Sequence, residues 1–324
     1  MKAIVYHSYG TPEALELTEI EKPSPKPGQV LVRVHAASIN SWDWDLLCGK
    51  QFLVRLIGGL IKPKHKVLGA DIAGVVESVG TGVTDFNRGD EVFGDVAESG
   101  FGGFAEYISV PAKLLARKPQ AMSFEEAAAL PQAGLLAVQG LRFGGELKRG
   151  QHILINGAGG GVGSLALQYA RHYGVEVDCV DVPEKFEMLR ALGAAHCMDY
   201  TEEDYTRTGK QYDLILDVIA HRRIADYKRA LKNGGTFSMI GGSMGGLLLK
   251  LMVFGPLISK AAGKKLGIMG YRPTRKDLDL LSKLFEEGKL KPVIDRVYAL
   301  EQTADAFRYF GSGKVQGKIL IKIN

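Results

Sequence analysis

The chain of 324 residues is longer than one hydrophobic core usually supports, so we expect two domains. Its apolar and charged fractions, 46% and 24%, are ordinary for a globular protein and exclude a disordered or fibrous chain. A net charge of +5 suits an anionic ligand, but neither a Lys/Arg block nor an RNA-binding signature accompanies it, so no nucleic-acid partner is expected.

The cysteines and the hydropathy of the chain indicate its compartment. Cys48, Cys179 and Cys197 are odd in number and lack the spacing of a disulfide framework or a structural zinc site. The N-terminus turns polar and acidic too soon for a secretory signal, and no stretch reaches the roughly 20 apolar residues of a spanning helix. We therefore predict a cytoplasmic protein with reduced thiols and no transmembrane segment.

Short alternating strands dominate the first third of the chain. The clearest is residues 29–37, QVLVRVHAA, in which Val30, Val32 and Val34 share one face. Glycine-containing turns separate it from further strands expected at residues 1–7, 72–79 and 91–94. Residues 1–120 are therefore predicted to form a β-rich domain.

The pattern changes near Pro119, where a helix begins with the capping-box spacing of Ser123 and Glu126. Strands and helices then alternate, which is typical of a parallel, doubly wound sheet. Strands are predicted at 152–156, 175–180, 195–198, 214–218 and 236–240, and helices at 162–173, 185–192 and 223–231. The tail, with helices at 275–287 and 304–310 and strands at 293–298 and 318–323, is expected to return to the first domain and complete it.

The stretch from Gly150 to Asp181 contains a β-α-β unit with a glycine-dense turn, NGAGGGVG. Gly157 permits a sharp exit from the strand, Gly160 has no Cβ to keep the backbone away from phosphates, and Gly163 lets the helix pack on the strand. The helix N-terminus adds unpaired N–H groups and the positive end of its dipole. The unit therefore predicts a site for a dinucleotide pyrophosphate.

The literal Gly-x-Gly-x-x-Gly pattern is absent, because Ala158 stands where its first glycine is needed, and a glycine cluster alone could be an ordinary turn. The full order of strand, turn, helix, strand and acid favours dinucleotide binding, since Asp181 lies 18 positions after Gly163, close to the roughly 20 expected of an acid that binds ribose. The predicted cofactor-binding residues are Gly157, Ala158, Gly160, Gly161, Val162, Gly163, Asp181, Lys185 and Tyr200.

Short motifs are spread over the whole chain in a fixed order: VHAASIN, LGADIAGVVESVG, GDEVFG, FAEY, the glycine turn, LGAAHCMDY, YDLILDV and GKILI. Together they resemble the medium-chain dehydrogenase/reductase superfamily, above all its zinc-free quinone oxidoreductase branch, which includes zeta-crystallin-like and reticulon-interacting reductases. The resemblance implies an α/β protein with a GroES-like substrate domain (1–120, completed by 271–324) and a Rossmann domain (121–270). It also implies a cleft between them, NAD(P)H as cofactor, and a homodimer.

The resemblance also bears on metal. Zinc-dependent relatives carry Cys at the position of Asn40 and His-Glu at the positions of Ala70 and Asp71. Neither Asn nor Ala supplies the thiolate and imidazole that hold a catalytic zinc, so we expect no metal. Without this Lewis acid, a quinone or an α,β-unsaturated carbonyl is a better hydride acceptor than a simple carbonyl, because conjugation spreads the incoming charge.

The family analogy places Asn40 and Asp43 beside the nicotinamide, with Asn40 as hydrogen-bond donor and Asp43 as its positioning partner. Trp44 stands where relatives often carry Tyr; it keeps an N–H donor but loses a hydroxyl that could relay a proton. The alternative interpretation is that Asn40 or Ser41 only caps a short helix through Leu47.

Asp181 should accept hydrogen bonds from a free ribose diol and repel a 2′-phosphate, which favours NADH. Lys185 and Tyr200 could instead hold the phosphate of NADPH, and Lys185 could also be a solvated helix residue. We predict hydride transfer from NAD(P)H to a quinone or enone. The alternatives are a zinc-free alcohol or aldehyde dehydrogenase and a low-turnover NAD(P)H-binding sensor. Leu136, in place of the family's Thr, and Trp44 keep the sensor open.

Two stretches, residues 52–66 and 247–265, combine apolar side chains with lysines and are expected to be loops. They could form a mobile entrance to the substrate cleft for a lipophilic acceptor, or make shallow contact with an anionic membrane surface. They could also pack on each other or on a second copy of the chain.

Overall fold

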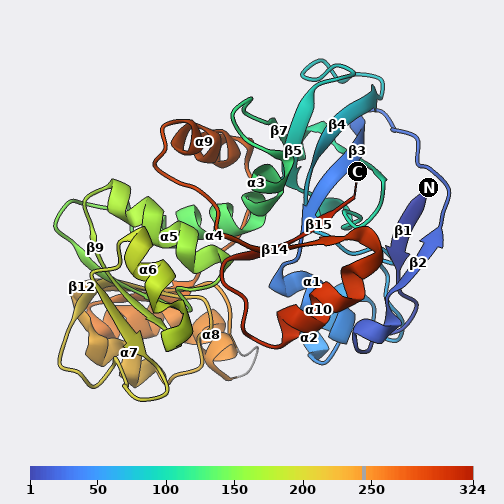
Figure 1. The fold of residues 1–324 in the computed structure, drawn as a ribbon. Helices are drawn as coiled ribbons and strands as arrows, with labels where there is room; N and C mark the ends of the chain where they lie inside the picture. The colour runs from blue at the N-terminus through green and yellow to red at the C-terminus, as the bar shows by residue number, and fades with distance from the viewer. Residues whose placement is uncertain (243–245, 324) are drawn as a thin grey trace. The chain divides into compact units, whose positions relative to one another are not determined.

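The computed structural model describes residues 1–242 and 246–323, and the chain divides into two compact units (Figure 1). The first consists of Met1–Ala133, Pro273–Gly288 and Pro292–Asn324, and the second of Gly134–Arg272 and Lys289–Lys291. The first unit extends past the expected boundary at residue 120, because helix α3 (Phe124–Ala129) packs on its sheet.

The first unit contains a mainly antiparallel sheet in the order β14-β15-β3-β4-β5-β7, with β6 also paired to β3. The valines of β3 that were predicted to share a face are all buried in the core of this sheet. As predicted, the tail returns to it, since β15 pairs with β3. Its strands are β1 (Lys2–Val5), β2 (Glu16–Glu19), β3 (Gln29–Ser38), β4 (Asp71–Val79), β5 (Glu91–Asp95), β6 (Tyr107–Pro111), β7 (Leu115–Arg117), β14 (Ile294–Ala299) and β15 (Lys318–Lys322). Its other helices are α1 (Ser41–Cys48), α2 (Phe52–Gly58), α9 (Arg275–Glu286) and α10 (Thr303–Gly311).

The second unit contains a parallel sheet in the order β10-β9-β8-β11-β12-β13, which confirms the doubly wound prediction. The strands are β8 (His152–Asn156), β9 (Glu176–Asp181), β10 (His196–Asp199), β11 (Tyr212–Asp217), β12 (Leu231–Met239) and β13 (Lys265–Ile268). The helices are α4 (Pro131–Arg142, which starts in the first unit), α5 (Gly161–His172), α6 (Phe186–Leu192), α7 (Ile224–Ala230) and α8 (Gly246–Ala262). The chain winds outward in opposite directions from β8 and β11, so the carboxyl ends of these two strands form a topological switch point.

The two apolar-basic stretches, which were expected to be loops, are partly helical, and residues 59–66 form a loop of the expected kind. Residues 52–58 form α2, and residues 247–262 form most of α8, which continues through Pro256. Both helices are apolar on their outward faces, so the polar stripe that marks an amphipathic helix in a sequence is missing. Within residues 1–242 and 246–323, no helix is both long enough and apolar enough to cross a bilayer.

Candidate functional site

The glycine turn joins β8 to α5 at the switch point. Gly157 has a φ of +80°, a conformation that side chains other than glycine rarely adopt. A Cβ at Gly163 would lie 2.4 Å from the Cα of Ala158, so glycine is needed for α5 to pack on the strand end. A Cβ at Gly160 would meet no atom closer than 3.8 Å, so the missing side chain leaves open space in front of the turn.

Asp181, at the end of β9, is bound to this turn. Its Oδ2 accepts a 2.7 Å hydrogen bond from the Gly159 N–H, and its Oδ1 accepts one of 3.0 Å from the Val182 N–H. The Lys185 ammonium lies 3.2 Å from Oδ1, and both side chains are buried. Lys185 is therefore not the solvated helix residue of the alternative interpretation. It neutralises part of the charge with which Asp181 would repel a phosphate.

Tyr200, the other residue expected near a 2′-phosphate, directly follows β10 and is 47% exposed. Its neighbour Asp199 pairs in register with Asp181 on the adjacent strand. The residues predicted to choose between nucleotides thus lie at the carboxyl ends of two neighbouring strands.

Asn156 and Asp217 end the two strands of the switch point. The Asn156 amide donates to Asp217 Oδ1 at 2.8 Å, and the Tyr227 hydroxyl donates to Oδ2 at 2.9 Å. Burial raises the pKa of Asp217, and these hydrogen bonds oppose that shift. Sequence analysis did not select this pair, although a polar residue at the end of each of two apolar strands was a usable signal.

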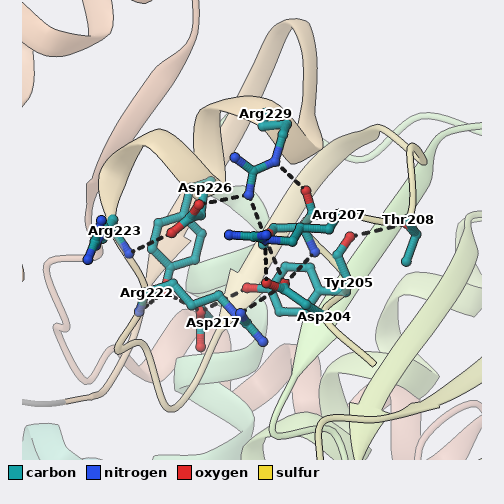
Figure 2. Close-up of polar contacts among 11 residues, drawn as sticks. Asp204, Tyr205, Arg207, Thr208, Asp217, Arg222, Arg223, Asp226 and Arg229 are labelled. Carbon is teal, nitrogen blue, oxygen red and sulfur yellow. Dashed lines mark hydrogen bonds and ion pairs between the residues drawn. The ribbon is translucent and has the colours of Figure 1, made fainter. Parts of the chain in front are cut away.

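Figure 2 shows how charged side chains beyond Asp217 hold the loop before β11 to helix α7. The Arg222 guanidinium lies 2.8 Å from Asp204 Oδ1, and Arg229 donates to the Thr206 carbonyl at 2.7 Å. The turn that follows β11 lies beside the glycine turn, since a Cβ on Gly157 would come within 3.3 Å of Val218.

In the first unit, Asn40 lies in a buried polar cluster at the N-terminus of α1. Its Oδ1 accepts a hydrogen bond of 2.5 Å from the Lys318 ammonium, and its Nδ2 donates to Asp71 Oδ2 at 3.0 Å. Because an ammonium only donates and a carboxylate only accepts, the orientation of the carboxamide is fixed. Nδ2 carries a second hydrogen, which is the donor that the predicted role needs.

Asp43 has no exposed surface, and its carboxylate accepts hydrogen bonds from the N–H groups of Asn40 (2.9 Å) and Gly69 (2.8 Å). Burial raises the pKa of Asp43 to about 7, and the two backbone donors act in the opposite direction. Asp43 therefore fixes the backbone of Asn40, which is the N-cap residue of α1. The Asn40 side chain makes no cap hydrogen bond and is held by Lys318 and Asp71 instead, so Asn40 does more than begin the helix.

Lys318 and Asp71 form an ion pair with 3.5 Å between Nζ and Oδ2. Asp71 also accepts hydrogen bonds from the Ser38 hydroxyl and the Gln132 N–H, both at 2.9 Å. Burial lowers the pKa of Lys318, and the neighbouring Asp71 raises it. Sequence analysis missed this lysine, which opens the final strand within the GKILI motif.

This cluster does not fit a zinc ion. The Asn40 oxygen and both Asp71 oxygens already accept hydrogen bonds, and the Lys318 ammonium would repel a second cation. In the part of the chain that the structure describes, the side chains with metal-ligand spacing are His152, Glu176 and Asp178 in the second unit. There, Asp178 is already bound by the Lys210 ammonium at 3.3 Å and the Tyr212 hydroxyl at 3.0 Å.

Trp44 packs on α10. Its ring centroid lies 6.0 Å from that of Phe310, and a Cβ on Gly311 would fall 2.3 Å from a ring atom. The indole thus joins α1 to the returning tail, and its proposed use as an N–H donor stays a prediction.

Family models match both units. One described as "Alcohol dehydrogenase GroES-like domain" matches residues 26–120, and one described as "Zinc-binding dehydrogenase" matches residues 192–321. Two relatives are each 34% identical over 99% of this chain and 79% of their own length. They are 2-methylene-furan-3-one reductase of Solanum lycopersicum and the chloroplastic NADPH-dependent alkenal/one oxidoreductase of Arabidopsis thaliana.

A solved structure, the quinone oxidoreductase of Coxiella burnetii, is similar over 100% of this chain and 99% of its own, with a TM-score of 0.86 and 29% identity. The relatives and this structure agree with the motif resemblance along the whole chain. This chain belongs to the medium-chain dehydrogenase/reductase superfamily, in its quinone oxidoreductase branch.

Proposed function

We propose that this protein is an NAD(P)H-dependent oxidoreductase that reduces a quinone or an α,β-unsaturated carbonyl compound. The names of its relatives describe reduction of a methylene-furanone and of alkenals and enones, and that of the similar solved structure describes a quinone oxidoreductase. The observation in this chain that supports the proposal most is the glycine turn at the switch point. Its open face at Gly160 fits a pyrophosphate, because a phosphate could approach the N-terminus of α5 closely.

When bound, the dinucleotide supplies a hydride. The residues of this chain hold the dinucleotide in place. We propose that the N–H groups of Gly161, Val162 and Gly163, in the first turn of α5, point toward the pyrophosphate. Gly157 and Ala158 shape the preceding bend, and Asp181 keeps it in place through its bond to the Gly159 N–H.

We propose that the acceptor is activated without metal. A conjugated acceptor gains negative charge on its carbonyl oxygen as hydride arrives at the far end of the conjugated system. A hydrogen bond from Asn40 Nδ2 would stabilise this charge, and Lys318, Asp71 and Asp43 keep the donor oriented in advance. The proton that completes the reduction comes from water in this scheme, because Trp44 offers no hydroxyl.

For the nucleotide, we propose a preference for NADH that is modest in size. Asp181 can still accept a hydrogen bond from a ribose hydroxyl, since three donors leave a carboxylate one further acceptor direction. The Lys185 ammonium reduces the repulsion of a 2′-phosphate, and Tyr200 adds a hydroxyl nearby. NADPH is therefore expected to work less well than NADH but to remain usable.

We also propose a cytoplasmic homodimer whose surface makes shallow contact with a membrane. The free thiols of Cys48, Cys179 and Cys197 agree with a reducing compartment, and the dimer follows the family resemblance. Membrane contact is supported by the exposed apolar side chains of α2 and α8.

The test is to follow the absorbance of NADH and of NADPH with a panel of quinones, enones, alkenals and saturated ketones. We expect oxidation with conjugated acceptors and at least about tenfold slower oxidation with their saturated counterparts, because only conjugation spreads the charge. Alcohol-dependent reduction of NAD⁺ would support the zinc-free alcohol dehydrogenase instead. Binding of the nucleotide without oxidation by any acceptor would support the sensor.

A further inference from the structure

Helix α8 presents an exposed apolar face. Leu251 and Gly255 are buried toward the sheet. The outward side chains are between 51% and 68% exposed, namely Leu249, Met252, Val253, Phe254 and Leu257. A surface helix usually turns charged and polar residues outward. An apolar face of this kind, on one helix and uninterrupted from Met252 to Phe254, indicates an interaction surface.

The charge on α8 is of one sign, since Gly246–Ala262 contains no acidic residue. On α8 itself the charged residues are Lys250 and Lys260, which are exposed near its two ends. A long apolar side chain can enter a bilayer while a neighbouring lysine extends its ammonium to the headgroups.

A basic pocket adjoins the first turn of α8. Its volume is about 350 Å³, and it is lined by His221, Arg222, Arg223, Ile224, Gly246, Leu247 and Lys250. Arg222 is already paired with Asp204, but Arg223 points away from that pair (Figure 2). The pocket therefore combines an apolar wall with positive charge, which suits the phosphate of a lipid headgroup next to its acyl chains.

We propose that α8 docks on an anionic phospholipid bilayer. Its five outward apolar side chains would enter the boundary between headgroups and acyl chains, and its lysines and the adjoining pocket would bind headgroup phosphates. A second copy of the chain fits this face less well, because α8 packed on α8 would bring Lys250 and Lys260 against like charges. The inference specifies the membrane contact proposed above and does not depend on the redox reaction.

The test is cosedimentation of the full chain with vesicles of phosphatidylcholine alone or mixed with phosphatidylglycerol. We expect binding to the anionic vesicles, at least about tenfold weaker binding to neutral ones, and release as salt rises. Met252→Glu and Leu257→Glu should each weaken binding about tenfold or more. Val297→Glu, which changes a 49% exposed valine of the first unit, should leave it unchanged.

A charge-matched pair completes the test. Lys250→Glu should weaken anionic-vesicle binding, whereas Lys276→Glu, at an exposed position on α9, should have a smaller effect. Independently of these variants, the fluorescence of Phe254→Trp should be quenched by brominated acyl chains beyond the quenching of the parent tryptophans.

Equal binding to both kinds of vesicle, or none, would overturn the inference. So would a Leu257→Glu variant that loses a dimer while keeping vesicle binding, which would identify a second copy as the occupant. Turnover of a water-soluble quinone, measured without vesicles, shows separately whether the proposed reaction occurs.

Discussion

The Asn40 carboxamide is held between an ammonium and a carboxylate, which leaves its second Nδ2 hydrogen in a defined direction. If this hydrogen stabilises charge on the acceptor, Asn40→Ala should lower kcat about 10²-fold and leave the KM for NADH nearly unchanged. Ser41→Ala, at the exposed next position, is the control and should behave like the parent protein. Steady-state kinetics that show the same small change in both variants would remove Asn40 from the reaction.

Asp43 predicts a pH dependence of stability. Its pKa rises from about 4 in the unfolded chain to about 7 in the folded one, so the folded state binds the proton more tightly. Its contribution to the free energy of unfolding is therefore greatest near pH 4 and is lost as pH rises toward 7. The nearby charges act in opposite directions, since Asp71 raises this pKa and Lys318 lowers it.

Urea unfolding of the parent protein and of Asp43→Asn, measured between about pH 4 and pH 7, checks this sign. The parent should lose stability relative to the variant as pH rises, because the asparagine does not titrate. A stability of the parent relative to the variant that stays constant, or that increases with pH, would contradict the burial of an ionisable carboxyl at this position.

At the scale of elements, the glycine turn offers a matched pair of variants. A Cβ at Gly163 would meet backbone atoms at 2.4 Å, so Gly163→Ala should lower the free energy of unfolding by about 1–3 kcal/mol. Gly160 has an ordinary extended conformation and open space, so Gly160→Ala should fold normally and still raise the Kd for NADH about tenfold or more. Denaturation and NADH fluorescence titration distinguish the two effects, and unchanged NADH binding by Gly160→Ala would place the pyrophosphate elsewhere.

The ion pair between Asp181 and Lys185, at the end of β9, predicts that substitutions of the two residues shift the nucleotide preference in opposite directions. Asp181→Asn removes the negative charge and should move the ratio of kcat/KM toward NADPH by about tenfold. Lys185→Met leaves that charge without its neutralising partner and should move the ratio toward NADH. Kinetics with both nucleotides check this, and shifts in the same direction for both variants would show that the ion pair does not set the preference.

The elements that could be predicted are those whose sequence patterns lie close together in the chain. The β-α-β unit was predicted closely, since its glycines, apolar strands and terminal acid lie within one short stretch. Helix α8 was missed, because its outward face is as apolar as its buried one and the helical period is hidden. The hydrogen bond between Lys318 and Asn40 joins residues 278 positions apart. No spacing pattern in the sequence predicts such a contact.

At the scale of the whole molecule, the two units differ in whether their candidate site residues come from one continuous stretch or from distant parts of the chain. The glycine turn and its support lie within the continuous stretch Gly134–Arg272. The polar cluster around Asn40 needs the returning tail, because β15 brings Lys318 beside β3. The sequence analysis expected the tail to return to the first domain, but the role of its lysine became visible only from the contacts.

The measurement that tests the central claim most directly is a single turnover of chelator-treated protein with an enone and NADH that carries deuterium at the transferring position of C4. We predict that the deuterium appears on the β-carbon of the reduced acceptor, with one acceptor reduced for each NADH and no change in rate when zinc is added. NADH that binds without passing its deuterium on, or transfer that requires zinc, would contradict the account.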